Sequence, residues 1–163
     1  MRLAWGLAAT CLAGVAEAHQ FKVERSLMLE AWPDKLHVAA AIRVPSGEGQ
    51  AVLRLLAPDA KAREALLATR ALDGLRLAVG TATVTLSEVK MRLNEVPEGP
   101  LELMLLGWVA LPPQAVTVNL TTTASSEPLE VRVLDGRRRF ETRSRRARLG
   151  RQDRLRVRYE AAP

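Results

Sequence analysis

Two histidines, His19 and His37, are the residues whose side chains most directly suggest chemistry. Residues 1–18 have the form of a secretory signal, and cleavage after Ala18 would leave His19 with a free α-amine. An N-terminal histidine chelates through its amine and Nδ1, and with a second imidazole it gives the nitrogen-rich geometry that Cu(II) prefers. The sequence therefore predicts a copper or nickel site at His19 and His37. One argument against this site is that pairing of the two strands in a hairpin would place the two histidines far apart. The alternative is that His19 is present only because of the cleavage site and that His37 is a surface residue of a strand.

Arginines gathered near the C-terminus form a second candidate site. Guanidinium groups recognise phosphates and carboxylates through paired donors. The predicted anion-binding residues are Arg137, Arg138, Arg139, Arg143, Arg145, Arg146, Arg148 and Arg151. For an exported protein, this cluster predicts docking on an anionic membrane surface or on an acidic protein partner. Export and the lack of interleaved aromatic residues argue against nucleic acid. The alternative is a solvated hairpin whose outward positions are arginine.

No catalytic motif accompanies these two candidates. The chain has no Gly-x-Ser-x-Gly elbow and no His-Glu-x-x-His pair, and its acidic residues are scattered without the spacing of an acid–base pair. We therefore expect no catalytic residues and a non-enzymatic binding or accessory domain. A metal site and arginine docking remain open as its two modes of binding.

Composition and the signal pattern predict the compartment of the protein and its number of domains. The single cysteine, Cys11, lies within the signal, so the mature chain has no disulfide to stabilise it. Residues 19–163 have the length of one domain with its own core. The formal net charge of +6 is concentrated between residues 132 and 158. We expect a periplasmic or secreted protein whose basicity is local.

The elements that must position these residues are mostly strands. Alternating apolar residues predict strands over 23–31 and 36–44, joined at a Pro-Asp turn, and the first places Arg25 on the same face as Leu27 and Leu29. Helical spacing over 48–72 predicts two helices that break near Ala57-Pro58, with Gly74 suited to a left-handed cap.

Strand patterns resume after Gly74. They predict strands over 75–79, 84–93, 116–121, 129–133 and 155–159, with a hairpin turn at Asp135-Gly136 before an arginine-rich C-terminal hairpin. The apolar run 101–111 predicts either a strand buried on both faces or a short buried helix. The fold class is mainly β, an antiparallel β-sandwich-like domain of seven to nine strands with a helical insertion. An α+β domain is the alternative.

The segment AHQFKVERSLMLEAWPDKLHVAAAIRVP, residues 18–45, resembles a known exported type. It is similar to the start of the extracytoplasmic N-terminal domain of HupE/UreJ and nickel–cobalt exporter membrane proteins, where a signal ending in Ala-His leads into a strand, a Pro-Asp turn and a second strand. Together with the similar stretch 73–79, the resemblance covers residues 18–93. Those proteins continue into several membrane helices, whereas the run 101–111 is too short to span a membrane. The resemblance therefore implies an accessory domain linked to metal handling and to a membrane protein complex, and it does not imply transport.

Overall fold

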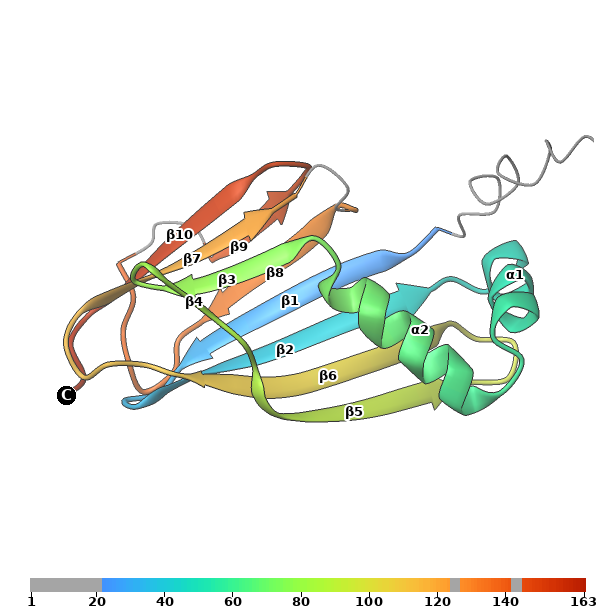
Figure 1. Ribbon diagram of the computed structural model, residues 1–163, viewed down its shortest axis with the longest axis horizontal. Helices are drawn as coiled ribbons and strands as arrows, with labels where there is room; N and C mark the ends of the chain where they lie inside the picture. Colours follow the sequence, from blue (N-terminus) through green and yellow to red (C-terminus); the bar gives the residue numbers. More distant parts are fainter. Residues whose placement is uncertain (1–21, 124–126, 142–144) are drawn as a thin grey trace, which may run out of the picture.

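The computed structural model describes residues 22–123, 127–141 and 145–163 as two β-sheets and two helices (Figure 1). The helices are α1 (Glu48–Leu56) and α2 (Ala60–Leu72), and the strands are β1 (Glu24–Ala31), β2 (Lys35–Val44), β3 (Leu75–Val79), β4 (Ala82–Val84), β5 (Ser87–Glu95), β6 (Leu101–Ala110), β7 (Val116–Thr122), β8 (Leu129–Leu134), β9 (Arg146–Leu149) and β10 (Arg154–Tyr159). The predicted class, mainly β with a helical insertion, is confirmed.

The larger sheet has six strands in the order β5-β6-β2-β1-β8-β9. Its centre is the predicted hairpin of β1 and β2, which pair antiparallel from Glu24 opposite Arg43 to Ala31 opposite Leu36. The expectation of a purely antiparallel sheet is wrong at one ladder, because β1 and β8 run parallel. The chain reaches β8 from the other sheet rather than by a turn beside β1, and local turn signals do not specify the direction of such a crossover.

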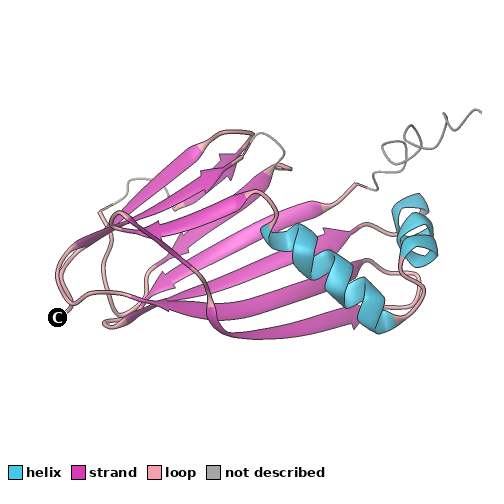
Figure 2. Cartoon of the chain, in the orientation of Figure 1, coloured by secondary structure: helices cyan, strands magenta, loops and turns pink. Residues whose placement is uncertain are grey.

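The smaller sheet, in the order β10-β7-β3-β4, and helix α2 share one face of the larger sheet. Figures 1 and 2 show α2 lying across β2, β6 and β5, while β3, β7 and β10 lie over the other half. Inward residues of both sheets and of α2 form one core, which includes Leu29, Ile42, Leu67, Leu103 and Val157. The other face of the six-stranded sheet points away from this core.

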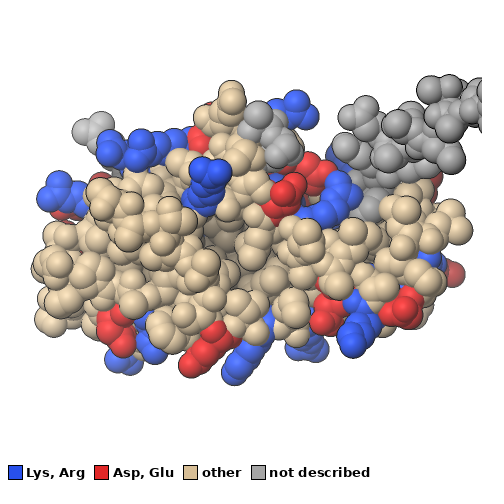
Figure 3. Space-filling model, viewed as in Figure 1, with Lys and Arg blue, Asp and Glu red and all other residues tan. Residues whose placement is uncertain are grey.

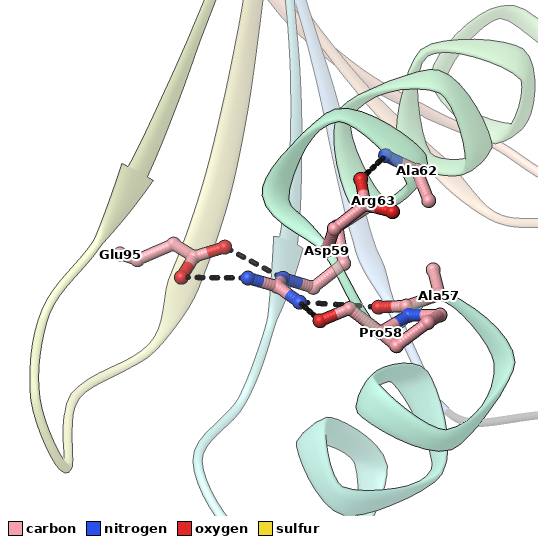
Figure 4. A network of polar contacts seen from close by, with 6 residues as sticks. All are labelled: Ala57, Pro58, Asp59, Ala62, Arg63 and Glu95. Atoms are coloured by element: carbon pink, nitrogen blue, oxygen red, sulfur yellow. Dashed lines mark hydrogen bonds and ion pairs between the residues drawn. The ribbon is translucent and has the colours of Figure 1, made fainter.

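The two helices form where the sequence places them, with the break at Ala57-Pro58. Asp59 caps α2 by accepting a hydrogen bond from the Ala62 backbone N–H at 2.8 Å. In the next turn, Arg63 donates to both carboxylate oxygens of Glu95 at 2.7 and 3.2 Å and to the carbonyls of the break (Figure 4). This network joins the start of α2 to the end of β5. The predicted left-handed cap is confirmed at Gly74, whose φ is 65°.

Two local expectations differ from the structure. The run 101–111 forms the strand β6, but only one of its faces is buried, and Met104 and Leu106 are 41% and 48% exposed on the other. The Asp135-Gly136 pair does not make a two-residue hairpin, because β8 ends at Leu134 and β9 begins at Arg146. A Cβ at Gly136 would lie 2.1 Å from the Ala31 carbonyl oxygen, so this glycine permits close approach to β1 rather than a tight turn.

Candidate functional site

The outward side chains of the six-stranded sheet form a continuous surface, which we call the open face. Strand register sets its rows, because residues that pair across strands project to the same side. On β1, β2, β6 and β8 the inward residues are buried, whereas these are half-buried or exposed. The outward residues form five rows, each written from the β5 and β6 side to the β8 and β9 side. They are Ala110 and Lys35; Ser87, Trp108, His37, Glu30 and Leu134; Lys90, Leu106, Ala39, Met28, Arg132 and Arg146; Arg92, Met104, Ala41, Ser26, Glu130 and Arg148; and Asn94, Glu102, Arg43 and Glu24.

The centre of the open face is an apolar strip. Small residues on β2, Ala39 and Ala41, form its floor, and the larger Met28, Met104 and Leu106 stand beside them on the neighbouring strands. These three are 39%, 41% and 48% exposed. A hollow of about 770 Å³ lies over all of these residues except Leu106, and charged side chains that include Glu24, Arg43, Glu102 and Arg132 also line it. Exposed apolar side chains gathered in a hollow mark a binding surface more often than a bare solvent face.

Basic residues flank the strip on both long sides. Arg132, Arg146 and Arg148 lie on β8 and β9, and Lys90 and Arg92 lie on β5. Figure 3 views the molecule from the helix side, with the open face behind, and shows both basic and acidic side chains projecting along the edge formed by β5.

Acidic residues are fewer on this surface: Glu24, Glu102 and Glu130 lie toward one end of it, and Glu30 lies toward the other. Glu24 pairs with Arg43 at 3.6 Å, and Glu102 stands opposite the same arginine. Glu130 lies opposite Arg148. The open face therefore combines an apolar centre with an excess of positive charge along its flanks.

The predicted arginine cluster is divided among several environments. Arg146 and Arg148 lie on the open face. Outside it, Arg145 pairs with Asp135 at 2.6 Å and the Arg137 guanidinium lies 4.7 Å from the centre of the Trp32 ring. Two more, Arg139 and Arg151, are exposed in connecting segments, and Arg143 lies outside the described residues. The cluster is not one hairpin surface, because a long connection separates β8 from β9.

Arg138 does not fit its predicted role in binding anions. It is 1% exposed, and its guanidinium donates to the backbone carbonyls of Glu160 at 2.5 Å, Pro112 at 2.7 Å, Pro33 at 3.3 Å and Gln114. Burial lowers the pKa of Arg138, an effect that the neighbouring Tyr159 opposes. With its donors directed at carbonyls, Arg138 joins three chain segments and does not face solvent.

The two predicted metal ligands are not brought together in the part of the chain that the structure describes, because His19 lies outside it. His37 lies on β2 between Glu30 and Trp108, and its ring centroid is 5.7 Å from that of Trp32 in an edge-to-face arrangement. Among the described residues, no group of three or more His, Cys, Asp or Glu side chains is placed to hold a metal ion. Within the same residues, no helix has the length and hydrophobicity needed to cross a membrane.

Sequence reasoning missed Lys90, Arg92 and Arg132, and it assigned Met104 and Leu106 to the core. Strand alternation alone shows which residues share a face, but the strand order β5-β6-β2-β1-β8-β9 is needed to bring them together. A further basic row, Arg154, Arg156 and Arg158, lies on β10 in the other sheet, where Figure 3 shows basic side chains gathered. The chain matches no model of a known protein family and no curated protein.

Proposed function

We propose that this protein is an extracytoplasmic binding domain without catalytic activity, which docks an acidic segment of a partner protein on its open face. The observation that carries the proposal is the placement of basic residues on the strands to both sides of the apolar strip, over which the hollow opens. The signal pattern of residues 1–18 supports export, and the resemblance to accessory domains of metal exporters supports a partner in a membrane complex.

A protein segment fits this surface better than an anionic membrane. Four of the five strip residues line the hollow, and basic residues stand on the strands to either side of the strip. A lipid surface would meet the charged flanks first, and the floor residues Ala39 and Ala41 would remain out of contact. A protruding segment can contact both the floor and the flanks, so that it uses hydrophobic burial and charge together.

The affinity for a polyglutamate peptide tests the electrostatic part of this proposal. The purified exported protein is titrated with the labelled peptide at increasing NaCl concentration. The test variant carries Arg132→Glu and Arg148→Glu, and the control carries the same charge change at Arg139 and Arg151, which lie off the open face. We expect the test variant to lose at least about tenfold in affinity, and the control to change less than about threefold.

Three results would contradict the proposal. Equal losses in the two variants would mean that net charge alone, and not the open face, attracts the peptide. Affinity that does not fall with salt would exclude a charge-based surface. Binding abolished by a chelator would instead favour the copper or nickel site at His19 and His37, since arginine docking needs no metal.

A further inference from the structure

The apolar strip has the dimensions of an α-helix. It covers β6, β2 and β1, and two strand spacings of about 4.8 Å give a width of about 10 Å. A helix with its side chains is about 10–12 Å across. From Met104 to Trp108 along β6, the strand rise of about 3.3 Å gives about 13 Å, the length of a helix of about nine residues.

Backbone hydrogen bonding separates a helix from an extended segment on this surface. The central strands use their N–H and C=O groups within the sheet, so the open face presents only side chains to a ligand. An extended segment lying over Met28, Met104 and Leu106 would place its own backbone groups against apolar atoms without partners. A helix satisfies those groups internally and presents an apolar stripe instead.

Charge defines the sides of such a helix. With its apolar stripe over Ala39 and Ala41, a helix along β2 turns its two flanks toward β5 and toward β8 and β9. Those strands carry Lys90 and Arg92 on one side, and Arg132 and Arg148 on the other. The flanks of the helix must therefore be acidic on both sides of the stripe.

From this geometry we infer that the partner segment is an acidic amphipathic α-helix that lies along β2 in the apolar strip. The inference rests on the proposed docking function and specifies the form of the ligand. Recognition would follow the helix-in-groove mode, in which side chains at positions i, i+3, i+4 and i+7 make the apolar contacts. The apolar strip accounts for affinity, and the basic flanks account for orientation and preference for acidic sequences.

A second copy of the chain is a poor occupant of the same strip. If two open faces stack about a twofold axis parallel to the strands, the β5 flank of one copy meets the β9 flank of the other. An axis across the strands places β5 over β5 and β9 over β9. Both arrangements bring basic residues against basic residues in a low-dielectric interface, which costs free energy.

The test compares two labelled peptides of identical composition. One places Leu on a single helical stripe with Glu on both of its flanks, and the other permutes the same residues so that no stripe forms. The protein variant Ala41→Glu adds a carboxylate to the floor of the strip. Its matched control is Ala78→Glu, since Ala78 is also half-buried on the outward face of a central strand, in the other sheet. Met104→Ser, which shortens an exposed side chain, is the second test variant if Ala41→Glu fails to fold.

We expect the striped peptide to bind at least about tenfold more tightly than the permuted one and to gain helical circular dichroism when bound. Ala41→Glu and Met104→Ser should reduce that preference, and Ala78→Glu should preserve it. Equal binding of the two peptides, or tight binding without a gain in helicity, would overturn the inference, and so would binding only to phosphatidylglycerol vesicles.

The two proposals fail separately. If polyglutamate binding depends on Arg132 and Arg148 while the striped and permuted peptides bind equally, the docking proposal is retained and the inference of a helical ligand is wrong. If charge reversal at Arg132 and Arg148 has no effect on any acidic probe, the docking function fails as well.

Discussion

Replacing Arg138 by methionine is expected to destabilise the protein far more than the same change at the neighbouring Arg137. Methionine keeps much of the side-chain volume but removes every donor. In the native protein, the Arg138 guanidinium donates to the carbonyl of Pro33 in the β1–β2 turn, to that of Pro112 after β6 and to that of Glu160 after β10. Loss of this group therefore affects the connections of both sheets at one end of the domain.

The magnitude follows from the contacts. Three carbonyls accept close hydrogen bonds from Arg138, those of Glu160, Pro112 and Gln114, while Pro33 accepts a longer one at 3.3 Å. A buried acceptor left without a donor costs about 1–3 kcal/mol. The variant also avoids burying a charge, which offsets part of that loss. We expect a net decrease of about 3 kcal/mol in the free energy of unfolding, a large part of the 5–15 kcal/mol that is usual for a domain.

Urea unfolding followed by tryptophan fluorescence measures this difference, since Trp32 lies beside Arg137 at the same end of the sheet. Arg137→Met removes an exposed cation stacked on that ring and should cost no more than about 1 kcal/mol. Arg138→Lys keeps the charge with a single donor group, and its decrease in the free energy of unfolding should lie between those of Arg137→Met and Arg138→Met. If Arg138→Met and Arg137→Met unfold at the same urea concentration, the reasoning about the buried carbonyls is wrong.

Three further predictions concern other buried contacts. Burial raises the pKa of Tyr159, the only tyrosine in the sequence. The stability that its neutral form contributes is therefore complete below pH about 10, and it is lost as the pH rises toward the higher folded-state pKa. Tyrosinate absorbance should follow alkaline unfolding, and Tyr159→Phe should remove this pH dependence without lowering stability at neutral pH. Gly136→Ala should cost at least about 2 kcal/mol in urea unfolding because its Cβ would collide with the Ala31 carbonyl oxygen, and an unchanged midpoint would contradict that contact. Arg63→Met should lower the free energy of unfolding by about 2 kcal/mol in the same assay, since it removes both hydrogen bonds to Glu95 and the donors to two carbonyls. A decrease below about 0.5 kcal/mol would mean that solvent screens the ion pair and that these contacts contribute little to stability.

Local elements of this fold follow from the sequence because their signals are local. Period-two alternation specifies β1 and β2 and correctly places Arg25 among the inward residues, where it donates to the carbonyls of Ala71 at 3.0 Å and Asp73 at 2.9 Å. The helical period and Pro58 specify α1, α2 and the break between them. In each case the residues that determine the structure are neighbours in the chain.

What the sequence does not specify is set by contacts between distant segments. The parallel pairing of β1 with β8 joins strands about a hundred residues apart and has no turn signal. The burial of Arg138 depends on carbonyls from three connections, and its run Arg137-Arg138-Arg139 resembles a solvated surface. The basic flanks of the open face are equally non-local, because Arg92 and Arg148 share a surface only through four intervening strands.

The error at β6 supports the docking proposal. Its sequence has apolar residues on both faces, which is the pattern of a strand covered on both sides. The inward residues Leu103 and Leu105 meet that expectation, being buried against the core. The outward residues Met104 and Leu106 have the same chemistry without the cover, on a sheet whose other outward positions near the flanks are charged. A strand exposed to water only for structural reasons usually carries polar residues there, and β8 does so at two of its three outward positions, Glu130 and Arg132, with Leu134 as the third. The composition of β6 is therefore the pattern that the proposed docking predicts, and the basic residues on both sides of it are the reason why the proposed partner is an acidic helix.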